Sequence, residues 1–208
     1  MTKNKVIPRA LALAAGCTLL AGVGTAAIAD TSAKDSQEIE VNVDIAKLEG
    51  PGALAMTVAG ASSMTLTESG SDDLVRQFTG TLPAVSVTDT RAAEDVAEGA
   101  YWYVLGTASA FTSDTGASIG AEHLGWNPRL IDGGESGGVA EGETVDTVLD
   151  AGPDNVGLVD QELLAMAWDS NEVLEEGSWT ASADLFLRTP STVEPGSYRS
   201  KLTLSLFE

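Results

Sequence analysis

The sequence predicts an all-β protein, an antiparallel β-sandwich of about eight or more short strands with little helix. Three observations support this. The first two are short segments in which apolar and polar residues alternate, and Gly- and Pro-containing turns between them. The third is length, because 208 residues, less an N-terminal leader, suffice for one domain with a substantial core. No fixed-period repeat is present, which excludes a solenoid, and closure into a barrel is the lesser alternative.

Residues 1–29 have the pattern of a secretory signal peptide. Three basic residues and no acidic ones open it, an apolar run follows, and Ala27 and Ala29 form a small-residue cleavage site that places the cut after Ala29. A retained anchor would need about 20 apolar residues, which the Gly- and Ala-rich run barely reaches. The stretch ending at Cys17 also resembles a lipoprotein box, so lipid anchoring through Cys17 is a minor alternative to release.

The expected strands follow a polar lead-in over residues 30–38. In the first, Ile39 and three further β-branched residues occupy every second position up to Ile45, a period of two that is typical of a half-buried strand. The domain is therefore expected over residues 39–208. Later segments of this kind are GALAMTVAG, SSMTLTES, PAVSVTDT, AYWYVLGTAS, TVDTVLDA, WTASADLFLR and SYRSKLTLSLF.

Two other segments differ from this pattern. Residues Asp160 to Trp168, DQELLAMAW, are the best candidate for one or two helical turns. Residues 131–143 are rich in Gly and Glu and are expected to form a polar, mobile loop between strands.

The charge is strongly one-sided, with 31 Asp and Glu against 11 Lys and Arg and a formal net charge of −20. The leader contributes basic residues only, so the mature chain is more negative still. Such a surface repels phosphates, which excludes nucleic acid and anionic lipid as partners. Because Cys17 is the only cysteine, the mature chain has no disulfide and depends on core burial or a bound ion for its stability.

Several short elements occur in an order that resembles the WxL-type surface domains of secreted Gram-positive proteins. The resemblance spans essentially the whole mature chain. It implies secretion, a β-sandwich and non-covalent association with the cell wall through peptidoglycan. Of the two Trp-x-Leu motifs, the first reads Trp102-Tyr103-Val104 and the second has Leu204 in place of Trp. The matching elements are Val87-Thr88-Asp89-Thr90-Arg91, the strand around Trp102, LGWNP, and Gly196-Ser197-Tyr198 leading to Leu202-Thr203.

The acidic and basic members of the candidate binding site are Asp89 and Arg91. Asp-Thr-Arg at the exit of a strand is typical of a structural corner, with the carboxylate accepting backbone N–H groups and the guanidinium reaching over a neighbour. Contact with a sugar or peptide is the alternative.

The aromatic candidates are Tyr101, Trp102, Tyr103 and Trp126. Consecutive strand residues point to opposite faces, so Trp102 is expected in the core, where sandwiches commonly bury a Trp. The two tyrosines would then share the other face, exposed as a platform for the apolar faces of sugar rings. Trp126 precedes Asn-Pro and is expected to cap one end of the sandwich rather than to hold a ligand.

No metal or other cofactor is expected. His123 is the only histidine, which leaves zinc without a ligand set, and no G-x-S-x-G motif accompanies it. The acidic loop DSNEVLEEGS offers oxygen ligands for calcium but lacks the EF-hand spacing, which favours a solvated loop. A carboxylate pair for glycoside cleavage stays open, although among 31 acidic residues any given pair arises by chance.

The sequence therefore predicts a secreted, non-catalytic surface module located at the cell wall. It would associate non-covalently with peptidoglycan or another envelope polymer, or with partner surface proteins. The alternative is a glycan-active hydrolase that uses two carboxylates. A third possibility is edge-to-edge pairing with another surface protein through the terminal strand, residues 197–207. No integral membrane span is expected in the mature chain.

Overall fold

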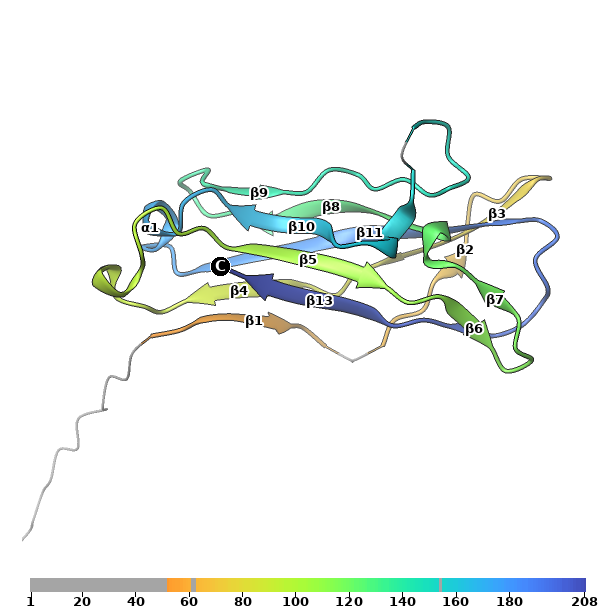
Figure 1. Cartoon of the computed structure of the whole chain (residues 1–208), viewed down its shortest axis with the longest axis horizontal. Helices are drawn as coiled ribbons and strands as arrows, with labels where there is room; N and C mark the ends of the chain where they lie inside the picture. The colour runs from red at the N-terminus through yellow and green to blue at the C-terminus, as the bar shows by residue number, and fades with distance from the viewer. Residues whose placement is uncertain (1–51, 61–62, 154) are drawn as a thin grey trace, which may run out of the picture. The chain divides into compact units, whose positions relative to one another are not determined.

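A computed structural model describes residues 52–60, 63–153 and 155–208, and its regular structure is almost entirely β-strand (Figure 1). All strand pairs are antiparallel, which confirms the prediction of an all-β, sandwich-like fold. Within these ranges, helix is limited to short 3-10 turns and the four-residue helix α1 (Ser170–Val173). No helix among the described residues is long and apolar enough to cross a membrane. The expected signal peptide, Cys17, the expected lead-in and the strand expected at residues 39–45 lie outside the described ranges.

The first sheet is built around the long strand β11 (Ser178–Pro190). β4 and β3 pair with successive halves of one edge of β11, and β8 pairs along its other edge. β1 adds outside β4, and β2 adds outside β3. The bounds are Leu54–Val58 (β1), Thr67–Glu68 (β2), Val75–Thr81 (β3), Val85–Asp89 (β4) and Leu124–Asp132 (β8).

The second sheet has four strands in the order β13-β5-β10-β9. A smaller, three-stranded sheet has the order β12-β6-β7. In sequence, β6 and β7 follow β5, and β12 precedes β13. The bounds are Tyr103–Ala108 (β5), Phe111–Ser113 (β6), Ser118–Ile119 (β7), Val139–Glu141 (β9), Glu162–Ala167 (β10), Tyr198–Arg199 (β12) and Leu202–Phe207 (β13).

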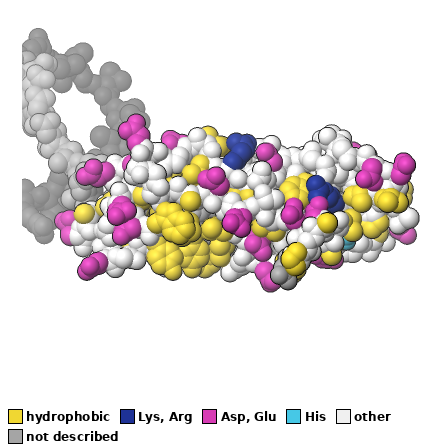
Figure 2. All heavy atoms as spheres, turned by 90° about the horizontal axis from the view of Figure 1, so that it is seen from above, with side chains coloured by type: hydrophobic (Ala, Val, Ile, Leu, Met, Phe, Trp, Pro, Cys, Tyr) yellow, Lys and Arg dark blue, Asp and Glu magenta, His cyan; other side chains and the backbone are white. Residues whose placement is uncertain are grey.

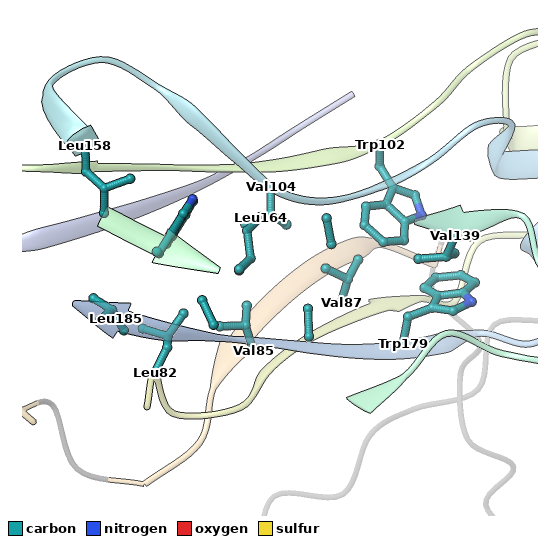
Figure 3. Close-up of a cluster of buried hydrophobic side chains, with 14 of the residues drawn as sticks. Leu82, Val85, Val87, Trp102, Val104, Val139, Leu158, Leu164, Trp179 and Leu185 are labelled. Carbon is teal, nitrogen blue, oxygen red and sulfur yellow. The ribbon is translucent and has the colours of Figure 1, made fainter. Parts of the chain in front are cut away.

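The core lies between the two main sheets and follows the period of two that the sequence predicts. Along β11, alternate residues from Trp179 to Leu187 are buried. Trp179 meets Trp102 of the opposite layer, with ring centroids 5.3 Å apart (Figure 3). A third indole, Trp126, packs against Gly106, where an added Cβ would lie 2.4 Å from the ring. The absence of a side chain at Gly106 therefore leaves room for the Trp126 indole.

One flank of the sandwich is closed by the chain that follows β9. The N–H of Gly142 donates to the carbonyl of Leu164 in β10 at 3.0 Å, and Val145 exchanges two backbone hydrogen bonds with Trp126 in β8. The chain thus crosses from one sheet to the other and curls them into a half-barrel. On the other flank, β1 and β13 are the edges of their sheets.

The segment expected as helical turns, Asp160–Trp168, contains strand β10 instead. Leu, Ala and Met favour helix, but pairing on both sides with β5 and β9 outweighs that preference. A shift of register between Leu163 and Ala165 turns both Leu164 and Ala165 into the core. The continuous apolar run is thus that of a central strand with a bulge.

Strands β3, β8 and β9 were not predicted, and residues 144–151 are not the strand that was expected. β8 contains Gly125 and Pro128, which ordinarily argue against a strand. Pro128 is tolerated because β11 is the only strand that pairs along β8, whose other edge is bridged at Trp126 by Val145, and a largely unpaired edge needs no donor from Pro128. Residues 144–151 supply the single bridge of Val145 and then turn.

Candidate functional site

The predicted binding residues lie in three different environments. Trp102 and Trp126 are 1% and 0% exposed, so both belong to the core and neither presents a surface to a ligand. Asp89 and Arg91 form an ion pair at the end of β4. Tyr101 and Tyr103 lie on the outer face of the second sheet, away from the core.

Asp89 and Arg91 bind each other in a two-pronged arrangement. Arg91 donates from Nε to Oδ1 of Asp89 at 2.9 Å and from Nη2 to Oδ2 at 2.6 Å, and its backbone N–H donates to Oδ1 at 3.1 Å. The same guanidinium donates from Nη1 to Glu208 at 2.8 Å. The group therefore links the end of β4 to the end of β13, across the flank that the strands leave open.

Both partners of this pair stay charged. Burial by itself would raise the pKa of Asp89, but hydrogen bonds from the Arg91 side chain and backbone, together with its positive charge, hold that pKa below its usual value. The hydrogen bond to Asp89, followed by the one to Glu208, raises the pKa of Arg91. Because these bonds occupy both groups within the chain, the pair is the structural corner rather than a free ligand-binding group.

The exposed tyrosines belong to a row of stacked rings. The Tyr101 and Tyr103 centroids are 5.8 Å apart with planes inclined by 25°. Phe207, opposite Tyr103 in β13, continues the row at 5.3 Å and 16°. Tyr101 is 48% exposed and Phe207 is 36% exposed, so the row lies open at the surface.

Strand β10 widens this row into a patch. Met166 lies opposite Tyr103 in the β10–β5 register, and Trp168, two residues further on, is 65% exposed. Figure 2 shows a patch of apolar side chains at this end of the molecule, with Asp and Glu around it. We call Tyr101, Tyr103, Met166, Trp168 and Phe207 the aromatic face.

Helix α1 connects the two segments that carry Trp168 and Tyr101 of the aromatic face. Asp169 caps the helix by accepting the Asn171 N–H at 2.8 Å. The N–H of Ser170 donates to Ala100 at 2.7 Å, and the Asn171 side chain donates to Ala97 at 3.0 Å. Helix α1 thereby ties Ser170, two residues after Trp168, to Ala100, the residue before Tyr101.

The acidic loop considered for calcium is used in other ways. Glu176 accepts the Trp179 indole N–H at 2.7 Å and the N–H groups of Glu135 and Ser136 at 2.8 Å and 2.6 Å. These bonds, the indole bond first, hold the pKa of Glu176 below its usual value. Across the described ranges, no cluster of three or more His, Cys, Asp or Glu is placed to hold a metal ion.

Comparisons with known proteins identify no family. No family model matches the chain, and no curated protein matches it. One similar solved structure is a family 123 glycoside hydrolase from Clostridium perfringens, with 15% identity and a TM-score of 0.30 over 63% of this chain. The matched region spans 18% of that enzyme, and a likeness at this level carries no argument about function.

Sequence reasoning located the two tyrosines but missed Met166, Trp168 and Phe207. The first two were missed because their segment was expected to be helical, so its alternation was not followed. Read as a strand, DQELLAMAW places Met166 and Trp168 on one side. Phe207 needed the register of β13 against β5, which links residues about a hundred positions apart in sequence and which no local pattern reports.

Proposed function

We propose that the protein is a secreted, non-catalytic surface module that associates non-covalently with peptidoglycan through the aromatic face. The observation that carries the proposal is the open row of stacked rings from Tyr101 to Phe207, extended by Trp168. The resemblance to WxL-type domains and the signal-peptide pattern support location at the cell wall.

The chemistry of the face suits a neutral, extended polymer. Exposed aromatic rings pack against the apolar C–H faces of sugars, and Tyr hydroxyls remain free for polar contacts at the rim. Large aromatic side chains also supply most of the binding free energy where they occur in an interface. The net charge of −20 opposes anionic polymers of the envelope, which favours the glycan strands.

Sedimentation with purified, protein-free Gram-positive cell walls tests this proposal. We expect the mature chain to co-sediment and the double variant Tyr101→Ala/Trp168→Ala to bind about tenfold more weakly or worse. Leu74→Ala is the matched control, because Leu74 is 77% exposed and lies outside the aromatic face. Sedimentation no greater than that of albumin, or equal binding by the double variant, would contradict the proposal.

A further inference from the structure

The outer face of the first sheet, opposite to the aromatic face, contains an open groove of about 540 Å³. Its floor is built from outward-facing residues of the neighbouring strands β3, β11 and β8. Thr79 of β3 lies opposite Phe186 of β11, and Asp184 of β11 lies between Thr81 of β3 and Asn127 of β8. Thr144 and Asp146, which follow β9, line the groove beyond β8. Three strands and one connecting segment therefore contribute to a single concave surface.

The aromatic ring in this groove is held in place. Phe186 occupies the space that a side chain at Gly125 would need, since a Cβ there would lie 2.4 Å from the ring. The Arg188 guanidinium lies 4.8 Å from the centroid of the ring. Arg188 itself donates to Gln77 at 2.7 Å and pairs with Asp150. The ring position is thus set before any ligand arrives, which lowers the entropic cost of binding.

The polar groups of the groove are oriented but keep free capacity. Thr81 donates to Oδ1 of Asp184 at 3.1 Å, and Thr144 donates to Oδ1 of Asn127 at 2.8 Å. The second bond fixes the amide of Asn127 so that its Nδ2 remains a donor. Among the described residues, this Nδ2, the Thr79 hydroxyl and the Asp146 carboxylate make no hydrogen bond, and all three belong to the groove lining.

We infer that this groove binds a neutral, polyhydroxylated ligand, a hexose unit within a glycan chain. Sugar hydroxyls would donate to Asp146 and Asp184 and accept from Asn127, while a C–H face of the ring packs against Phe186. Asp184 lies 3.8 Å from Arg129 in an exposed ion pair, so the Asp146 carboxylate is the group that repels an anion. An apolar ligand would leave these polar groups unpaired. The groove is open to solvent, so it does not enclose the ligand.

This site is separate from the proposed wall-binding face, because it shares no residue with it and lies on the other sheet. It is tested with ¹⁵N-labelled mature chain and three soluble probes: cellohexaose, maltohexaose and the hexamer of N-acetylglucosamine. We expect at least one probe to shift the amide signals of Thr79 and Asn127 and the Asn127 side-chain NH₂ in a saturable manner. The signals of Thr79 and Asn127 should move with such a probe even where those of Tyr101 and Trp168 also move, because the aromatic face is itself proposed to pack against sugar rings.

Substitutions then separate binding from folding. Asp184→Asn should weaken binding about tenfold or more, because it removes a charged acceptor of sugar hydroxyls. Asp114→Asn is the control, since it removes the same charge from a side chain that is 78% exposed and outside the groove. Asn127→Ala gives a second variant, and unchanged dispersion of the remaining signals shows that each variant is folded.

The inference is overturned if no probe shifts the groove signals, if the shifts are confined to the aromatic face, or if Asp184→Asn gives the same groove shifts as the parent chain. Its failure is distinguishable from failure of the proposed function. Loss of wall sedimentation in the Tyr101→Ala/Trp168→Ala variant bears on the aromatic face alone. Loss of sugar-induced shifts in Asp184→Asn bears on the groove alone.

Discussion

At the scale of single residues, the carboxylate of Asp89 is a buried charge that needs a partner. It is 4% exposed, and an ionised group at such a site is stable only when paired and hydrogen-bonded. Arg91 supplies the pair, and its side chain is itself only 12% exposed. Such a pair adds little net stability, but removing one partner leaves a buried charge without compensation.

Arg91→Ala is therefore expected to lower the free energy of unfolding by about 3 kcal/mol, measured by urea denaturation. The control is Arg199→Ala. Arg199 pairs with Asp114 where the two side chains are 73% and 78% exposed, so its loss should change stability by no more than about 0.5 kcal/mol. Equal losses in the two variants would show that Asp89 does not depend on its partner.

The depressed pKa of Asp89 also gives stability a defined pH dependence. The carboxyl of Asp89 binds its proton more tightly in the unfolded chain, where its pKa has the usual value of 3.8, than in the folded chain, where the pKa is lower. Stability therefore rises with pH between the folded and the unfolded pKa. The contribution of Asp89 is present in full above about pH 5 and is lost as pH falls through the folded pKa. The difference in Tm between the parent chain and Asp89→Asn should therefore shrink in acid. A difference that stays constant with pH would contradict this.

At the scale of elements, one glutamate organises a loop that looked mobile in sequence. Residues 131–143 contain four glycines within 133–138, yet Glu176 accepts two backbone N–H groups from them and the indole N–H of Trp179. Strand β9 begins at Val139, immediately after this anchored turn. The loop is thus attached to the core through Trp179.

Glu176→Ala should release this attachment. We expect faster hydrogen exchange at the amides of Glu135 and Ser136, with local stability lowered by about 1–3 kcal/mol because two donors and a buried indole lose their acceptor. The neighbouring variant Glu175→Ala is the control, since Glu175 is exposed. Unchanged protection of the two amides in Glu176→Ala would show that other contacts hold the loop.

The elements also show how far sequence reasoning reaches. Strands with clean alternation, such as β4 and β13, were predicted because burial on one face leaves a local pattern. β10 was not predicted, because helix-favouring residues were overruled by two strand partners that lie elsewhere in the sequence. The groove could not be predicted either, since it needs Thr81, Asp184 and Asn127 side by side, and their alignment depends on the register of three strands.

At the scale of the whole molecule, the dominant feature is unbalanced negative charge. The chain carries a net charge of −20, and few of its acidic groups have a basic partner in the described ranges. Mutual repulsion among them opposes the compact state. The exposed pair of Arg76 with Glu68 relieves it only locally, although the hydrogen bond from Arg76 lowers the pKa of Glu68 to about 2.

Added salt should therefore stabilise the protein. Raising NaCl from about 0.01 M to about 0.15 M shortens the Debye length from roughly 30 Å to roughly 8 Å, which weakens repulsion between distant acids more than attraction within close pairs. We expect Tm to rise by a few degrees in scanning calorimetry. Tetramethylammonium chloride should act alike if screening is the cause, and a fall in Tm with either salt would contradict the interpretation.

The uneven exposure of the tryptophans has a practical consequence. Trp102, Trp126 and Trp179 are at most 2% exposed, whereas Trp168 is 65% exposed. A dissolved quencher such as acrylamide reaches Trp168 far more readily than the other three, so most of the quenchable fluorescence originates from the aromatic face. Any partner that covers this face will shield that emission, and the chain thus carries its own optical reporter without a dye.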